Sequence, residues 1–304
     1  MRSNSTFRFA TDDLPEDDRL AIWREVMGRQ HMRMDIAPRE PASLSASIEV
    51  HRLPSAEISF IHSSPAVYTR TGELMQDGNG DFSFVRIESA GFGFTSGAVE
   101  EELGPGEGAI VFHGRPARFD VRAHTMANSI RINGELLRQA VRDLDERPVH
   151  RLPLDNTALR LIVSYVQMVM LSGVPDDPAL AHLISAHLID LVAFGIRPTV
   201  ETRERAAGAV QAARLGAIRA DILANLGQVR LSAKTIARRQ DVSERYVYLL
   251  FEQHGLSFSR FVTEERLKRA MTMLLDPACA AMRISDIAYA VGFGDLTTFN
   301  RAFR

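Results

Sequence analysis

The sequence predicts a multidomain α+β chain, in which an N-terminal antiparallel β-barrel with flanking helices precedes an all-α domain of two helix-turn-helix units. Short apolar runs separated by Gly and Pro occupy residues 45–132, as in compact antiparallel barrels. The last third of the chain twice repeats a short apolar helix, a tight turn and an amphipathic helix. A chain of 304 residues accommodates about two domains. We expect domains at 1–197 and 214–304, joined by a linker at 198–213.

The N-terminal region begins with a helix and continues in strands. Leu20, Trp23 and Met27 share one face of a helix expected at 15–27. Alternating or short apolar runs predict strands at 45–53, 58–61, 67–70, 82–89, 92–95, 108–112, 119–122 and 128–132. The turn Gly104-Pro105-Gly106-Glu107, ahead of an apolar run, recurs in cupin-like barrels. The predicted barrel is therefore cupin-like.

The barrel histidines do not predict a metal site. Metal-binding cupins need closely spaced His and carboxylate ligands, whereas His113 and His124 lie eleven residues apart and no His-X-His pair occurs. We interpret His62, His113 and His124 as structural barrel residues, with hydrogen bonding to a ligand as the alternative. No catalytic residue and no cofactor are predicted.

Three arginines suggest the chemistry of a ligand. Arg86, Arg118 and Arg131 lie in or beside predicted strands. An inward-pointing arginine needs a charge partner, because an unpaired buried cation is costly. A bound carboxylate would supply that partner, so we hypothesise an aromatic or organic acid as effector. Six phenylalanines are candidates for lining a cavity, although core packing explains most of them more simply: Phe82, Phe84, Phe92, Phe94, Phe112 and Phe119.

Residues 156–195 predict two adjacent helices with wide apolar faces. These helices either pack on the barrel or pair with a second copy of the chain, and the sequence leaves both open. The following segment, 197–211, is charged and Ala-rich and is broken by Pro198 and Gly208. We interpret it as the interdomain linker.

The two C-terminal units overlay residue by residue. Setting Ile236 on Ile287 places Ala237 on Ala288 and, in the turn, Val242 on Phe293. Helix starts are expected at four capping residues, Ser232, Ser243, Ser285 and Asp295. Gly255 is expected to end the first recognition-type helix, and Gly292 to need a positive φ.

A connecting helix is expected at 257–275. Its length would be roughly 28 Å, comparable with the ~34 Å that separates successive major-groove faces of a DNA duplex. The arrangement predicts that one chain reads two half-sites in double-stranded DNA.

These residues resemble a known family. The spacing of Arg266, Ala270 and Leu274, and the pairs Ile287-Ala288 and Gly292-Phe293 followed by Phe299, Arg301 and Phe303, are similar to the DNA-binding domain of AraC/XylS-type transcription regulators. The resemblance covers residues 231–304. It implies a cupin-like sensor domain and a dimer interface ahead of this region. In relatives the chain continues for about another helical turn, so we expect that the domain ending at Arg304 is C-terminally truncated or poorly capped.

The resemblance also implies which side chains read bases. They come from the exposed face of each second helix: Arg245, Tyr248 and Leu249 in the first unit, and Leu296, Thr297, Thr298 and Arg301 in the second. Leu249 stands where many relatives place a basic or polar residue. It is expected to contact thymine methyl groups, or the first helix mainly positions the domain.

Charge is distributed unevenly along the chain. Residues 214–304 hold 14 Lys and Arg against 9 Asp and Glu, a balance of +5, whereas the remainder carries −7, giving −2 overall. Local positive charge favours phosphate binding. The candidates for DNA-backbone contacts are Arg230, Lys234, Arg238, Arg239, Lys268, Arg269 and Arg283, although each also fits an ordinary solvated surface charge.

Other features bound the function class. The single cysteine, Cys279, suits a reducing compartment. The N-terminus lacks a basic-then-apolar export pattern, and we expect no apolar run long enough to span a bilayer, so a cytoplasmic protein is predicted. No GxxxxGK[ST], HExxH, GxSxG or CxxC motif occurs, which disfavours common hydrolases and nucleotide enzymes.

The leading hypothesis is a sequence-specific, effector-responsive transcription regulator, an activator rather than an enzyme, with DNA, a small-molecule effector and a second copy of the chain as partners. One alternative is a cupin-type enzyme with a helical tail, which predicts bound metal and turnover by residues 1–197. Another is a truncated, DNA-incompetent regulator that acts through dimerisation, which predicts that DNA binding requires a longer C-terminus.

Overall fold

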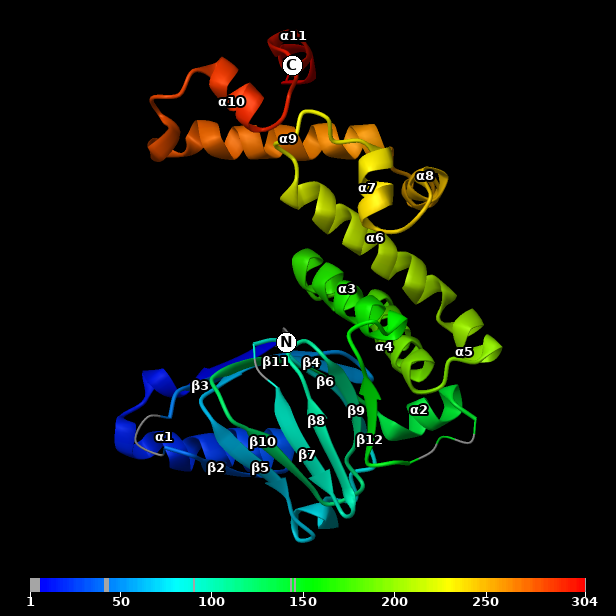
Figure 1. The fold of residues 1–304 in the computed structure, drawn as a ribbon. Helices are drawn as coiled ribbons and strands as arrows, with labels where there is room; N and C mark the ends of the chain where they lie inside the picture. The colour runs from blue at the N-terminus through cyan, green and yellow to red at the C-terminus, as the bar shows by residue number, and fades with distance from the viewer. Residues whose placement is uncertain (1–5, 41–43, 90, 143, 145, 304) are drawn as a thin grey trace. The chain divides into compact units, whose positions relative to one another are not determined.

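The computed structural model describes residues 6–40, 44–89, 91–142, 144 and 146–303. These residues form two compact units, Met1–Val210 and Gln211–Arg304, which we call the barrel unit and the helical unit (Figure 1). Each unit is described by itself.

The barrel unit contains two antiparallel sheets. The strand order is β1-β3-β4-β11-β6-β9-β12 in the seven-stranded sheet and β2-β5-β10-β7-β8 in the five-stranded sheet. The strands are β1 (Thr6–Ala10), β2 (Asp35–Pro38), β3 (Ala46–Arg52), β4 (Ala56–Ser63), β5 (Ala66–Arg70), β6 (Phe82–Ile87), β7 (Phe92–Ser96), β8 (Val99–Leu103), β9 (Gly108–Phe112), β10 (Ala117–Val121), β11 (Thr125–Ile132) and β12 (Val149–Leu152). The predicted cupin-like antiparallel fold is confirmed, and β1, β2, β8 and β12 are additional to the predicted strands.

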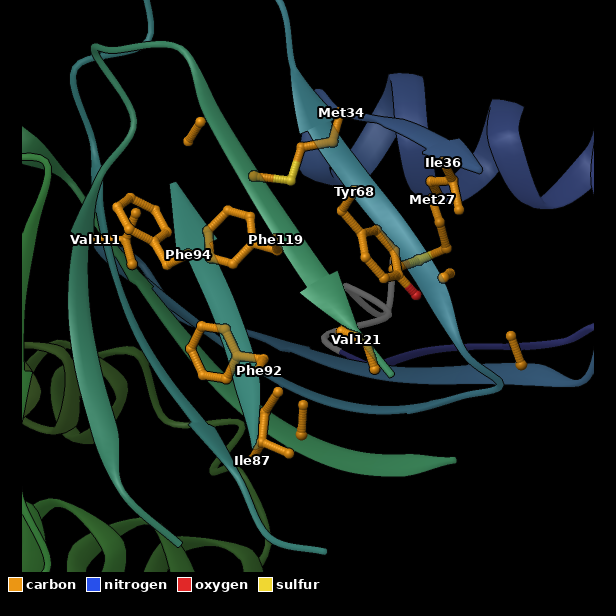
Figure 2. Close-up of a cluster of buried hydrophobic side chains, with 14 of the residues drawn as sticks. Met27, Met34, Ile36, Tyr68, Ile87, Phe92, Phe94, Val111, Phe119 and Val121 are labelled. Atoms are coloured by element: carbon orange, nitrogen blue, oxygen red, sulfur yellow. The ribbon is translucent and has the colours of Figure 1, made fainter. Parts of the chain in front are cut away.

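An apolar core lies between the inner faces of the two sheets. Phe92 and Phe94 of β7 point the same way, since they stand two residues apart on one strand. They meet Phe119 of β10 at ring-centroid distances of 6.0 and 5.1 Å. Figure 2 shows this cluster, with Met27 and Ile36 on its other side. Alternation along each strand therefore selects the side chains that fill the barrel.

Helices cover the outer face of the seven-stranded sheet. They are α2 (Gly134–Ala140), α3 (Thr157–Ser172) and α4 (Pro178–Ile196). The Arg138 guanidinium of α2 lies 5.8 Å from the ring centres of both Phe82 and Phe112, and Leu159 of α3 lies against Gly108 of β9. Both faces of β9 are thus buried, which explains why its sequence is continuously apolar. The packing of α3 and α4 on the barrel is one of the two arrangements that the sequence left open.

The helix α4 corrects one expectation. Its 19 residues are long and apolar enough, by length and composition, to cross a membrane, whereas the sequence analysis expected no such run. In the barrel unit this helix packs against α3, and Leu188, Leu191 and Val192 are fully buried. Its Asp190 pairs with Arg205 at 3.1 Å. These contacts are those of a core helix in a folded domain.

The N-terminal helix changes its winding midway. It begins as α1 (Glu16–Trp23), within the predicted helix at 15–27, and continues as the π-helix η2 (Arg24–Met32). It ends at Arg33, which adopts a left-handed conformation with φ 55°. Arg131 donates to the His31 carbonyl at 2.9 Å and Arg70 to the Arg33 carbonyl at 3.0 Å. Two strand arginines therefore hold the end of η2 against the barrel.

The helical unit contains two small cores. Its elements are α6 (Ala207–Ala224), which begins in the barrel unit, α7 (Ala233–Arg239), α8 (Glu244–Gln253), α9 (Phe258–Leu275), the 3-10 turn η5 (Pro277–Cys279), α10 (Ile284–Ala290) and α11 (Leu296–Phe303). The first core packs α6, α7, α8 and the start of α9 around Ile236 and Phe251. The second packs α9, α10 and α11 around Ile287 and Phe299. The all-α domain of two helix-turn-helix units is confirmed.

The segment expected to be a linker is largely helical. It forms α5 (Val200–Arg205) and the first part of α6. The break expected at Gly208 is wrong, because Gly208 lies inside the helix α6. Alanine has the highest helix propensity, so an Ala-rich segment absorbs the cost of one glycine. The division into domains at 1–197 and 214–304 stays a prediction.

Candidate nucleic-acid interface and barrel cavity

The first recognition-type helix, α8, has both of its expected ends. The Ser243 side-chain oxygen accepts a hydrogen bond from the Tyr246 amide at 3.1 Å. Gly255 follows the helix with φ 66°, a conformation that glycine adopts at little cost. Val247, Leu250 and Phe251 are fully buried. Burial of these three side chains fixes which face of α8 is turned outward.

That outward face carries the residues predicted to read bases. Arg245, Tyr248 and Leu249 are all exposed, Tyr248 and Leu249 by 43% and 44%. They line a shallow depression together with Glu244 and Glu252, two carboxylates that the sequence analysis did not select. Arg245 has no hydrogen bond or ion pair to any residue that the structure describes, so its guanidinium is available to a ligand. A carboxylate on such a face can accept from the exocyclic amine of cytosine.

The second recognition-type helix, α11, is capped by Asp295. One Asp295 oxygen accepts from the Thr298 amide at 2.7 Å and the other from the Thr298 hydroxyl at 2.9 Å. The bond from the Thr298 amide holds the pKa of the Asp295 carboxyl below its usual value. Phe299 is buried. The predicted reading residues, by contrast, are exposed: Leu296, Thr297, Thr298 and Arg301.

Three of the four expected N-caps are confirmed, and the N-cap expected at Ser285 is wrong. Ser232 accepts from the Thr235 amide at 3.2 Å, and Ser243 and Asp295 cap as described above. At α10 the N-cap residue is Arg283, whose amide donates to Asp286 at 3.3 Å. The helix therefore starts two residues earlier than expected, because the Asp286 carboxylate supplies the acceptor.

The candidate phosphate-binding residues all lie on the surface. They are Arg230, Lys234, Arg238, Arg239, Lys268, Arg269 and Arg283. Two have partners within the helical unit: Arg239 donates to Asp221 and Gln228, both at 3.1 Å, and Lys268 pairs with Glu265 at 2.6 Å. In these pairs the Arg239 and Lys268 side chains remain 36% and 69% exposed, so DNA phosphates can compete for these two cations as well.

One arginine connects the turn of the second helix-turn-helix to the first helix-turn-helix. Arg266 of α9 donates to the carbonyls of Leu226 and Gln228 at 3.1 and 2.8 Å, and its guanidinium lies 5.8 Å from the Phe293 ring centre. The neighbouring Gly292 has φ 103°, and a Cβ there would lie 2.1 Å from the Leu226 carbonyl oxygen. The positive φ expected at Gly292 is confirmed. The sequence pattern places Arg266 on a helix and gives no sign of these contacts.

A cavity of about 100 Å³ lies inside the barrel unit. One part of its wall is apolar, with Met34, Phe92 and Phe119 among the lining residues. The other part is polar and comes from alternate positions of neighbouring strands: Glu57, Ser59 and Ser63 on β4, Thr125, Ser129 and Arg131 on β11, and Ser83 on β6. The strand register sets Glu57 opposite Arg131 and Ser59 opposite Ser129. The polar wall therefore has charged side chains at one end and hydroxyl groups next to them.

The charged end is an internal ion pair. Glu57 is 8% exposed, and its Oε1 lies 3.0 Å from Arg131 Nη2 and 3.4 Å from His31 Nε2. Its Oε2 lies 3.5 Å from Arg52 Nε. Pairing of this kind is what makes a buried carboxylate tolerable beside a half-buried guanidinium.

Two histidines at the cavity are held neutral. Burial, reinforced by the nearby Arg70 and Arg131 cations, lowers the pKa of His113 to about 4. Its Nε2 lies 2.8 Å from the Ser83 hydroxyl. Burial also lowers the pKa of His31. At neutral pH both imidazoles offer one donor and one acceptor and carry no net charge.

Only some of the other barrel residues predicted from sequence line the cavity. Among the arginines, Arg131 lines the cavity, Arg118 is exposed, and Arg86 binds the Gly106 carbonyl and Glu88. His113 lines the cavity, whereas His62 and His124 are exposed. Of the six phenylalanines, the cavity wall includes Phe92 and Phe119, while Phe82, Phe84, Phe94 and Phe112 are buried elsewhere.

Residues that the sequence analysis missed complete the site. Glu57 and His31 lie at the charged end. Behind His113 the buried Arg70 pairs with Asp77 at 2.8 Å and donates to the His113 carbonyl at 2.8 Å. Among the residues that the structure describes, no three side chains of His, Cys, Asp or Glu gather as a metal site.

Comparison with known proteins places both units. Residues 23–195 match the model of the AraC-binding-like domain, and residues 236–304 match that of a helix-turn-helix domain. The AraC-like transcriptional activator CuxR, a solved structure, is similar in fold, with a TM-score of 0.52 and 18% identity over 88% of this chain and 95% of that chain.

Two curated relatives match over shorter stretches. The transcriptional activator RhrA of Rhizobium meliloti (strain 1021) is 36% identical over 91 residues, or 30% of this chain and 29% of that protein. The Msm operon regulatory protein of Streptococcus mutans serotype c (strain ATCC 700610 / UA159) is 31% identical over 75 residues, or 24% of this chain and 26% of that protein. The matches thus span less than a third of either relative.

Proposed function

The chain belongs to the AraC family of transcription regulators, and from this premise we propose that α8 and α11 read two half-sites in double-stranded DNA while the barrel cavity binds an effector. The observation that carries the proposal is the pair of capped helices. Each buries one face in its own core and exposes the opposite face. Such a helix presents side chains to a major groove.

Base reading is assigned to the exposed faces. On α8 the reading residues are Arg245, Tyr248 and Leu249, and on α11 they are Leu296, Thr297, Thr298 and Arg301. The arginines suit the paired acceptors of guanine, and the leucines suit thymine methyl groups. Since the Thr298 hydroxyl already donates to Asp295, it meets DNA as an acceptor or through its methyl group.

The exposed cations hold the domain on the duplex without reading sequence. The side chains of Arg230, Lys234 and Arg238 have no hydrogen bond or ion pair to a residue that the structure describes, so they are the first candidates for phosphate contacts. The balance of +5 in residues 214–304 favours this role. Binding is therefore expected to weaken as salt concentration rises.

We propose activation as the outcome, because the RhrA protein, similar over 91 residues, is a transcriptional activator. An effector then acts by population shift, binding the DNA-competent arrangement more tightly than the resting one. The single cysteine fits a cytoplasmic location. A homodimer is supported by the exposed Leu171, Leu180 and Leu183 around the α3–α4 turn, and sedimentation of the full chain tests it.

The experiment is selection of genomic DNA fragments by the purified full chain, at near-physiological salt with excess nonspecific competitor. We expect a bipartite site whose halves lie about one helical turn apart. Arg245→Ala and Arg301→Ala should each cost about 1 to 3 kcal/mol and relax the preference at one position. The matched control Arg238→Ala should weaken all sequences equally.

Two results would count against the assignment. If Arg245→Ala and Arg301→Ala keep the wild-type sequence preference, those arginines are removed from the reading set. If the folded chain enriches no site either alone or with a cavity ligand, sequence-specific reading by these two helices is wrong.

A further inference from the structure

The charges that line the barrel cavity cancel. The ionised groups among its lining residues are Glu57 and Arg131, which pair at 3.0 Å. The lining imidazoles of His31 and His113 are neutral because burial disfavours their protonated forms. Arg52 also lies 3.5 Å from Glu57, but its side chain is 59% exposed and does not line the cavity, so water screens its charge. The cavity wall itself thus presents no uncompensated charge to a ligand at neutral pH.

This balance works against charged ligands of either sign. A carboxylate that binds Arg131 must displace the Glu57 carboxylate or lie beside it, and two like charges in a poorly solvated site are costly. An ammonium that binds Glu57 meets the same obstacle from Arg131. A neutral molecule leaves the pair intact and therefore carries no such cost.

The remaining wall suits an apolar body with one polar group. Met34, Phe92 and Phe119 offer apolar surface, and the hydroxyls of Ser59, Ser83 and Ser129 offer hydrogen bonds beside the charged end. A protein cavity of about 150 Å³ lined by apolar side chains binds benzene. The volume of about 100 Å³ here is therefore on the scale of one ring.

We propose that the cavity selects neutral, ring-sized, largely apolar molecules that carry a hydrogen-bonding group, and that the Glu57–Arg131 pair enforces this charge selectivity. The inference rests on the proposed effector function of the barrel. The sequence predicted an aromatic or organic acid as ligand. The inference retains the aromatic ring but replaces the acidic group with a neutral polar group. Glu57 and Arg131 also line a depression on the surface of the barrel unit, so the pair stands between that surface and the interior.

Three probes that share one ring test the proposal. Benzamide is neutral, benzoate is an anion and benzylamine is a cation at pH 7.5. Calorimetric titration of the full chain should show benzamide binding at least tenfold more tightly than either charged probe. Ala127→Trp, which places a large side chain at the cavity wall, should abolish binding of all three.

Charge-removing variants should redirect the preference. Glu57→Gln keeps the shape of the side chain and leaves Arg131 without its carboxylate, so benzoate should become the tightest probe. Arg131→Gln should shift the preference toward benzylamine, but by less than the opposite shift in Glu57→Gln, because Arg52 stays 3.5 Å from Glu57. The matched control is Glu49→Gln on β3, whose carboxylate pairs with Arg8 at 2.7 Å outside the cavity, and it should keep the wild-type order. Circular dichroism establishes that each variant is folded.

The outcomes separate the two proposals. Tighter binding of benzoate than of benzamide by the wild-type chain overturns the charge selectivity and leaves the barrel as an effector site. Unchanged probe order in the folded Glu57→Gln variant overturns the role of the pair. Absence of binding by all three probes, in the wild type and both variants, overturns the inference, while the proposed function is judged separately by fragment selection.

Discussion

Arg70 and Arg131 each have a carboxylate partner in the barrel unit. Asp77 is 2.8 Å from Arg70 and Glu57 is 3.0 Å from Arg131. The same two guanidinium groups donate to the Arg33 and His31 carbonyls at the end of η2. The two guanidinium groups that pair with carboxylates therefore also hold the end of the π-helix.

Protonation of His113 should destabilise the barrel unit. Its pKa of about 4 lies below the ordinary value of 6.5, so the unfolded state binds the proton more readily. The stabilisation is complete above pH 6.5 and is lost as pH falls toward 4, by up to about 3 kcal/mol in total. Urea denaturation followed by Trp23 fluorescence, at pH values from 7.5 to 4.5, measures this loss.

The variant His113→Gln is the comparison for that series. It removes the titrating group and keeps a hydrogen-bonding side chain near Ser83. We expect a smaller fall in stability between pH 6.5 and 4.5 than in the wild type. Equal falls in the two proteins would assign the acid sensitivity to other groups, of which His31 and His187 also have lowered pKa values.

Gly292→Ala and Gly255→Ala test backbone conformation at two turns. Both glycines have positive φ, but a Cβ at Gly292 meets the Leu226 oxygen at 2.1 Å, whereas nothing lies within 4 Å of one at Gly255. We expect a loss on the order of 3 kcal/mol for Gly292→Ala and about 1 kcal/mol for Gly255→Ala. Thermal melts at 222 nm measure both, and equal losses would exclude the steric contribution.

At the scale of elements, the strands that the sequence did not predict share one property. β1, β12, β2 and β8 are the four edges of the two sheets. An edge strand has one partner and tends to be short and polar. Accordingly β8 carries three consecutive glutamates, and β2 ends at Pro38. Central strands can be predicted from apolar alternation. Edge strands lack this pattern and form because the neighbouring strand offers backbone hydrogen bonds.

Helix caps give a prediction at this scale. Ser243 accepts from the Tyr246 amide, so Ser243→Ala should destabilise the helical unit by about 1 kcal/mol. Ser285 lies inside the first turn of α10 and does not cap it, so Ser285→Ala should change stability by less than about half of that. Thermal melts at 222 nm compare the two variants, and a larger effect of Ser285→Ala would contradict the observed start of α10.

The two candidate sites differed in how far the sequence predicted them. The exposed faces of α8 and α11 follow from helical periodicity, because burial of Val247 and Phe299 places Arg245 and Arg301 outward. The cavity required pairings between distant segments. Glu57 meets Arg131 only through the β4–β11 register, and His31 arrives from a π-helix whose winding has no signal in the apolar pattern.

At the scale of the whole molecule, the two units have separate apolar cores and opposite charge, with +5 in residues 214–304 and −7 in the remainder. Separate cores allow separate unfolding. The single tryptophan, Trp23, lies in the barrel core, so its fluorescence reports that unit alone.

Unfolding should therefore depend on the probe. We expect the urea transition seen by Trp23 fluorescence to differ from the transition at 222 nm, to which the helical unit contributes. Gly292→Ala should move the 222 nm transition to lower urea and leave the fluorescence midpoint within error. A common shift of both midpoints would mean that the two units unfold as one cooperative body.

The bonds of Arg266 to the Leu226 and Gln228 carbonyls, beside the turn at Gly292, restrict how far α11 can swing relative to α8. A duplex turns by about 35° for each added base pair. One extra base pair between the half-sites therefore rotates the second groove away from α11 as well as lengthening the span. The loss of affinity caused by inserting one base pair between the half-sites therefore measures how strongly Arg266 restricts the movement of α11.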